Sequence, residues 1–212
     1  MSVDPRPPAE FDFPLSFSGP DGIGATPFDE FRADEAPDVS DAQGDDPAVA
    51  LRKTLGQFAT GVTVITTLKG EQVHGMTANA FMSVSLEPPL VLVSVDRRTK
   101  MCNLLHEGCH YGVSVLCDSQ SALSDRFAGR SAEGLPEPRF GLVRETPLVE
   151  GALAHFVASV QRSYWGGDHS LFLGRVEYAR HHSGSPLLFH GGRYERLKDS
   201  LGAHPAEPGA SA

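Results

Sequence analysis

The chain has 212 residues, enough for one domain with a core that folds unaided. Its 18 basic and 27 acidic side chains give a net charge of −9, which argues against nucleic acid or an anionic membrane as the main partner. The sequence shows no apolar run near the ~20 residues of a membrane span. Its three cysteines are too few and odd in number for a secreted disulfide framework, so we expect a cytoplasmic protein.

Residues 1–46 form an acidic leader. They hold 12 acidic groups, two arginines and seven of the 16 prolines, so their net charge is −10 while the rest of the chain carries +1. This composition predicts a disordered segment, and the early prolines argue against a signal peptide. Five phenylalanines lie among the acids. They leave two interpretations open: a low-complexity tail, or a short segment that docks on a partner protein or on the domain itself.

The folded domain is predicted to begin at Pro47, because Asp46 can cap a helix that carries a proline in its first turn. This helix is expected to end near Gly61. Further along the chain, the elements are predicted in this order: strands at 62–68, 75–87 and 90–96, a short helix capped by Thr99, a strand at 110–117, a helix at 119–128, a loop over 129–147, long strands at 152–164 and 169–181, and a last strand that ends before Lys198.

About seven strands with a few short helices indicate a mainly β fold, closed or partly closed into a barrel, over residues 47–198. Residues 199–212 form a small, polar tail, which we expect to be flexible. Strands do not alternate with long helices, so a Rossmann sheet is not expected. The sequence also lacks the phosphate-binding loop, the dinucleotide-binding glycine pattern and the nucleophile elbow of serine hydrolases.

No metal site is predicted. The spacing of Cys102, Cys109 and Cys117 fits no common zinc pattern, and we interpret all three as small core residues. The neighbouring pair His181 and His182 has no third ligand at a suitable spacing. We therefore interpret this pair as an exposed strand end rather than as metal ligands.

The stretch GMTANAFMSVSLEPPL, residues 75–90, carries small and hydroxylated side chains where a core strand would carry valine and isoleucine. Small side chains let a backbone approach a flat ligand closely, and hydroxyl and amide groups offer hydrogen bonds to it. The alternative is an edge strand whose serines and threonines face water. The sequence just downstream, Arg97-Arg98-Thr99-Lys100, is either an anion site at a helix start or a solvated charged turn.

Three blocks in this order resemble the flavin reductase-like family with the FMN-binding split-barrel fold: GMTANAFMSVSLEPPLVLVSVDRRTK, GDHSLFLGRV and PLLFHGGRY. The resemblance covers about residues 47–198. It implies an NAD(P)H:flavin oxidoreductase that transfers a hydride to FMN or FAD and often supplies a separate monooxygenase with reduced flavin. It also implies a homodimer with each flavin bound near the subunit interface. FMN or FAD, and NADH or NADPH, stay open.

The resemblance also implies site residues, matched by motif position, with His169 and Tyr194 as the catalytic residues. His169 is expected near the nicotinamide in a positioning role, and Tyr194 belongs to the other block associated with the site. The alternative for each is a structural role: His169 as a histidine whose hydrogen bonds are satisfied at the start of a strand, and Tyr194 as an aromatic residue packed in the barrel. Trp165 is expected either at the mouth of the site or packed on the barrel. The cofactor-binding residues that the resemblance implies are Thr77, Ala78, Asn79, Ser83, Val84, Ser85, Arg98, Thr99 and Lys100.

Two other functions stay open at this point. One is a flavin-binding electron carrier or sensor without a nicotinamide site. The other is a flavin-dependent oxidase or monooxygenase that acts directly on an organic substrate. A reductase consumes NADH with flavin alone, whereas a carrier shows no turnover and an oxygenase requires its substrate.

Overall fold

The structure is a computed structural model, and it describes residue 44 and residues 46–130 and 137–197. The C-terminal tail and nearly all of the acidic leader, including its phenylalanines, lie outside the described residues. The domain borders proposed from the sequence therefore stay predictions.

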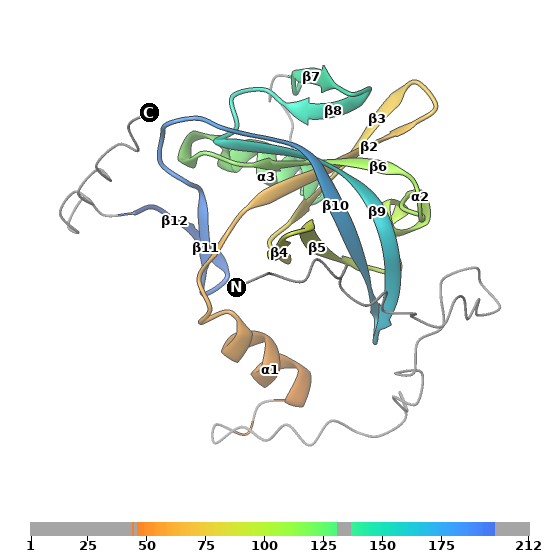
Figure 1. The fold of residues 1–212 in the computed structure, drawn as a ribbon. Coiled ribbons are helices and arrows are strands. Elements are labelled where there is room, and N and C mark those ends of the chain that lie inside the picture. The colour runs from red at the N-terminus through yellow and green to blue at the C-terminus, as the bar shows by residue number, and fades with distance from the viewer. Residues whose placement is uncertain (1–43, 45, 131–136, 198–212) are drawn as a thin grey trace, which may run out of the picture.

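Seven antiparallel strands form the main sheet, with β3 and β4 at its two ends (Figure 1). Their order across the sheet is β3 (Gln72–Ala78), β2 (Thr63–Lys69), β6 (His110–Val115), β9 (Ala154–Gly166), β10 (His169–His181), β5 (Pro89–Asp96) and β4 (Phe81–Leu86). Met76 from one end strand and Phe81 from the other pack against the same core cluster. The sheet therefore curls around a common interior, as a barrel does.

The other elements are short. Two small sheets are β1 (Thr60–Gly61) with β11 (Leu188–His190) and β12 (Arg193–Glu195), and β7 (Phe140–Val143) with β8 (Thr146–Val149). The helices are α1 (Pro47–Leu55), α2 (Lys100–Leu104), the 3-10 turn η1 (Asp118–Gln120) and α3 (Ser121–Phe127). The prediction of a mainly β fold with a few short helices is confirmed.

The core has two parts, one on each face of β2. Ile65 belongs to the barrel interior, which Met101 of α2 helps to close, and its neighbour Val64 belongs to a second cluster with Leu116 and Leu187. Both β2 residues are fully buried. Because successive side chains of a strand point to opposite faces, a β-branched run that is buried on both sides marks a strand between two packed layers.

The first helix begins as predicted and ends earlier. The Asp46 carboxylate accepts a hydrogen bond from the Ala48 amide at 2.9 Å, and Pro47 occupies the first turn. However, α1 ends at Leu55 rather than near Gly61. The reason is that Gly61 and the residue before it pair with β11 as a short strand, which a helix would prevent.

The predicted loop at 129–147 contains the β7–β8 hairpin over its second half. Arg144 and Glu145 form its tight turn with positive φ angles of 50° and 60°. Turns of this kind usually carry asparagine, aspartate or glycine at these positions. With arginine and glutamate in the turn, the sequence offered no hairpin signal.

One glycine of β10 is required by the packing of the barrel interior. A Cβ atom built on Gly174 would lie 2.0 Å from the hydroxyl oxygen of Tyr111. Tyr111 is fully buried, and its hydroxyl has no hydrogen-bond partner among the described residues. Burial raises the pKa of this phenol well above its usual range, so the group stays neutral.

Candidate functional site

Much of the small and polar character of β3 is explained by α3 rather than by a ligand. A Cβ atom on Gly75 would lie 2.5 Å from the ring of Phe127, which packs directly on this backbone. The Thr77 hydroxyl donates to the carbonyl oxygen of Ser124 in α3 at 2.7 Å. The neighbouring Ala78 is buried, and its carbonyl oxygen accepts a hydrogen bond from Thr63. These side chains are therefore committed to the fold.

The open part of the stretch begins after β3. Asn79, Ser83 and Val84 are exposed and Ser85 is half-buried. They lie on or next to β4, an end strand of the main sheet. Val84 forms a bulge in this strand, because Ser83 and Ser85 pair with successive residues of β5 and Val84 between them is left out of the pairing. An end strand presents backbone donors and acceptors along its free edge. This surface can therefore receive the polar edge of a flat ligand, and the interpretation as a water-facing edge strand is compatible with the same geometry.

The basic corner follows β5. Arg98 is 84% exposed and forms a two-point ion pair with Asp96, in which Nη2 lies 2.6 Å from Oδ2 and Nε 3.1 Å from Oδ1. Hydrogen bonds from Arg98 hold the pKa of the Asp96 carboxyl well below its usual range. Thr99 caps α2, since its hydroxyl donates to the Asp96 carbonyl and accepts from the Cys102 amide.

Lys100 at the start of α2 is exposed and lies close enough to His74 on β3 to influence its titration. Burial of the imidazole lowers the His74 pKa first, and the positive charges of Lys100 and Lys69 lower it further. The sequence gave no sign of this link between the basic corner and β3, because it joins residues of different elements.

His169 lies at the start of β10, opposite Asp96 of β5. Its Nδ1 donates to the Asp168 carboxylate at 2.7 Å. This hydrogen bond is the largest cause of a lowered pKa for the Asp168 carboxyl. The Asp168 contact also fixes the ring orientation and leaves Nε2 for a ligand, because the imidazole is 40% exposed. This contact makes Asp168 a further candidate for the site, which the motifs did not single out.

The other side of the same hairpin carries Trp165 and Arg97. The guanidinium carbon of Arg97 lies 4.6 Å from the indole centroid, and the Arg97 amide donates to the Asp168 carbonyl at 3.0 Å. The indole Nε1 is buried without a hydrogen-bond partner among the described residues. Trp165 thus packs on the barrel wall beneath an arginine, with its N–H donor unused.

Tyr194 lies elsewhere, on the small sheet. Its hydroxyl lies 2.8 Å from Ser124 Oγ and 2.9 Å from Asp125 Oδ1, and its ring packs edge-on against Phe189. Burial is the main cause of its raised pKa. The described contacts thus join Tyr194 to α3 and, through Ser124, to Thr77. They do not join it to His169, so the two residues assigned to catalysis are not in contact within one chain.

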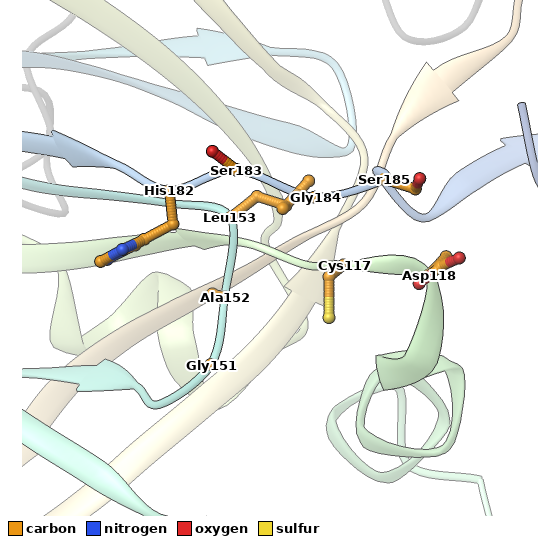
Figure 2. Close-up of a pocket in the computed structure, with 9 residues that line it drawn as sticks. All are labelled: Cys117, Asp118, Gly151, Ala152, Leu153, His182, Ser183, Gly184 and Ser185. Atoms are coloured by element: carbon orange, nitrogen blue, oxygen red, sulfur yellow. The ribbon is translucent and has the colours of Figure 1, made fainter.

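A cavity of about 450 Å³ lies at the far end of β10 from His169 (Figure 2). Its lining residues are Cys117, Asp118, Gly151, Ala152, Leu153, His182, Ser183, Gly184 and Ser185. None of the predicted cofactor-binding residues lines it, so it is separate from the candidate site. Cys117 faces this cavity and is half-exposed, whereas Cys102 is buried as predicted.

Within the described part of the chain, no group of three or more metal-ligating side chains is close enough to hold a metal ion. His181 ends β10 and is exposed together with His182, as predicted. No described helix is long and apolar enough to cross a membrane.

Comparison with known proteins connects this geometry to a family. The sequence pattern of the family described as "Flavin reductase like domain" matches residues 55–198. An NADH-dependent flavin reductase of Rhodococcus sp is 48% identical over 159 residues, which cover 72% of this chain and 90% of that protein. The chain belongs to the flavin reductase-like family.

Two further matches to this flavin reductase-like chain are a protein from another organism and a solved structure. The reductase component of 4-hydroxyphenylacetate 3-monooxygenase from Thermus thermophilus is 41% identical over 149 residues, covering 70% of this chain and 95% of that protein. The Streptomyces globisporus NADH:FAD oxidoreductase SgcE6, solved with NAD and FAD fragments, superposes with a TM-score of 0.67 at 41% identity. That match covers 73% of this chain and 96% of the other, and it confirms the expected fold class.

Proposed function

We propose that this protein is an NADH-dependent flavin reductase that passes a hydride from nicotinamide to free FMN or FAD and supplies a partner monooxygenase with the reduced flavin. The observation that carries the proposal is family membership over residues 55–198, with relatives that bear this activity in their names. NADH is favoured over NADPH because the Rhodococcus and Streptomyces proteins are named for NADH. A cytoplasmic location is part of the same proposal.

The described residues fit a flavin. Ser83 lies on an open sheet edge and Asn79 in the bend between β3 and β4, where both can meet the polar rim of the ring, and Lys100 and its neighbours place positive charge just beyond β5. The flavin, when bound, supplies the ring that accepts the hydride. The protein has to hold the nicotinamide against that ring at roughly 3–3.5 Å. His169, fixed by Asp168, can donate to or accept from the nicotinamide side without acting as a base.

The test of this function is NADH oxidation, followed at 340 nm, by purified protein with FMN or FAD and no organic substrate. The proposal expects many turnovers per enzyme with flavin alone. No oxidation by a protein that binds flavin indicates the electron carrier or sensor. Oxidation that needs an added organic substrate indicates the oxygenase.

We also propose a homodimer, and α1 supports it. This nine-residue helix buries only Ala50, and it projects away from the sheet (Figure 1). Leu51 and Leu55, four positions apart, are 43% and 64% exposed, and Phe58 just beyond is 78% exposed. An isolated helix of this length is marginal in water, so it needs a surface to pack on. Met82, Val84 and Leu86 of β4 are exposed too and offer such a surface on a second copy. In a two-fold dimer, α1 of each copy would then pack on β4 of the other.

The double variant Leu55→Asp with Phe58→Asp is therefore expected to halve the mass measured by light scattering after size-exclusion chromatography. If the flavin binds near the interface, its Kd rises by on the order of tenfold or more. Leu142→Asp is the matched control, because Leu142 is 68% exposed on β7, away from α1 and β4. A monomeric wild-type protein, or a double variant that stays dimeric, would contradict the proposed interface.

A further inference from the structure

We propose that Arg97 and Trp165 are positioning residues, which together clamp the turn between β9 and β10 and thereby fix His169 for the nicotinamide. This inference rests on the proposed function and adds to it two residues to which neither the motifs nor the family resemblance gives a role. The clamp, meaning the contact between Arg97 and Trp165, acts on the imidazole through Asp168.

The turn between β9 and β10 has little packing of its own. Gly166 and Gly167 are exposed, and nothing lies within 4 Å of the Cβ position of Gly167, whose φ is 68°. The pairing of β10 with β5 ends at His169 and Asp96. Exposed backbone with few packed side chains opens easily. The position of His169, which directly follows this turn, therefore depends on the contacts that hold the turn in place.

Arg97 holds the turn at two points. Its backbone amide donates to the Asp168 carbonyl oxygen at 3.0 Å, one residue beyond the last pair of the ladder. Its guanidinium carbon lies 4.6 Å from the centroid of the Trp165 ring, where a cation is attracted to the face of the indole. Trp165 precedes the two glycines and Asp168 follows them. The two contacts therefore attach both sides of the turn to the residue that follows β5.

Asp168 connects the clamped turn to the imidazole. Its carbonyl oxygen accepts the hydrogen bond from Arg97, and its carboxylate accepts the one from His169 Nδ1 at 2.7 Å. A site is precise only if the residues that orient its functional groups are themselves held in place. A misplacement of about 1 Å can reduce a rate by on the order of a hundredfold. The contacts of Arg97 are thus expected to matter for a nicotinamide bound at His169.

The clamp and the imidazole lie on opposite faces of the hairpin. Trp165 pairs with Ser170, which is fully buried, so this pair faces the barrel interior. His169 pairs with Gly166, one residue out of step with that pair. Successive side chains of a strand alternate between the two faces, so His169 points away from the barrel interior. The clamp therefore acts on a nicotinamide at His169 through the turn and not through contact with it.

The tryptophan carries a cost that a purely apolar residue would avoid. Its Nε1 is buried and has no hydrogen-bond partner among the described residues. A buried donor that is left unpaired lowers stability, and such a group calls for a reason other than packing. The contact with Arg97 supplies this reason, because tryptophan is the best aromatic partner for a cation.

The test is a double-mutant cycle on NADH oxidation at saturating flavin. Arg97→Met removes the charge and keeps a long side chain. It is expected to lower kcat/KM for NADH by about fivefold to thirtyfold, the range for loss of a partly desolvated cation–π contact. Arg97→Lys keeps a cation and should fall between Arg97→Met and wild type, and Trp165→Phe, with a weaker aromatic partner, should also give a partial loss. The KM for flavin should stay within about twofold in each variant.

The decisive comparison is made in the His169→Ala background. There, Arg97→Met should change kcat/KM for NADH by less than about twofold, because the imidazole that the clamp positions is absent. A loss that multiplies with that of His169→Ala would mean that Arg97 acts directly on a ligand or on the fold, and it would overturn the proposal. An unchanged kcat/KM for NADH in Arg97→Met alone, or a raised KM for flavin in its place, would overturn it as well.

Arg162→Met is the matched control, because Arg162 is an exposed arginine on β9, away from the turn, whose partner is Glu107 at 3.6 Å. It should leave kcat/KM for NADH at the wild-type value. Urea unfolding followed by circular dichroism shows that each variant is folded. Failure of the proposed function is visible separately, as a wild-type protein that does not oxidise NADH with flavin alone.

Discussion

Replacing Gly174 with alanine is expected to lower the free energy of unfolding by about 3 kcal/mol, at the upper end of typical overpacking costs. The new methyl group would lie 2.0 Å from the Tyr111 hydroxyl oxygen and 2.8 Å from the ring carbon that bears it. Tyr111 is fully buried among β-branched side chains, so its ring has little room to move. The measurement is urea unfolding followed by circular dichroism, with the midpoint and the slope both reported.

A second substitution separates steric overlap from other causes. Tyr111→Phe removes the hydroxyl oxygen, so it should restore part of the stability lost in Gly174→Ala. On its own, Tyr111→Phe should be neutral or stabilise the fold by about 1 kcal/mol, because the hydroxyl has no partner among the described residues. Gly141→Ala is the control, since nothing lies within 4 Å of its Cβ position. If Gly174→Ala unfolds at the wild-type midpoint, the packing described for the barrel interior is wrong.

His169→Ala is expected to reduce kcat/KM for NADH by on the order of tenfold to a hundredfold, the range for loss of one charge-assisted hydrogen bond. The reason is that Asp168 holds the imidazole at 2.7 Å and leaves Nε2 for the nicotinamide side. The KM for flavin should stay within about twofold, because the printed side-chain contact of His169 is with Asp168 and not with the exposed residues expected at the flavin, such as Asn79 and Ser83. Initial rates with NADH varied at saturating flavin give both parameters.

His181→Ala serves as the matched control, because this exposed histidine ends the same strand at its far end. Asp168→Asn should give a smaller loss than His169→Ala, since the ring stays and only its fixed orientation is lost. Equal kcat/KM values for NADH in His169→Ala and wild type would remove His169 from the site.

The fold was predictable where the chain carries local signals. The Asp46 cap, the β-branched run of β2 and the glycine turn before His169 all lie where the sequence places them. The β7–β8 hairpin was missed because its turn uses Arg144 and Glu145 in a backbone conformation that favours glycine. A turn of this kind can be predicted from the sequence only where it carries the usual asparagine, aspartate or glycine, and this turn does not.

The candidate site was predictable only in part, because several of its contacts join distant elements. The family motif predicts Thr77 as a cofactor-binding residue. No local sequence pattern shows that its hydroxyl donates to the carbonyl oxygen of Ser124 in α3. The sequence likewise counted Arg97 and Arg98 as one cluster. The contact of Arg97 with the Trp165 ring and the ion pair of Arg98 with Asp96 are what separate them.

The most direct measurement is anaerobic mixing of the protein with one equivalent each of NADH and flavin, followed at 450 nm for the flavin and 340 nm for the nicotinamide. We expect both absorbances to fall together at the same rate, many-fold faster than without protein, because one hydride leaves NADH for each flavin reduced. Flavin and NADH absorbances that decay no faster than in the protein-free mixture would contradict a flavin reductase.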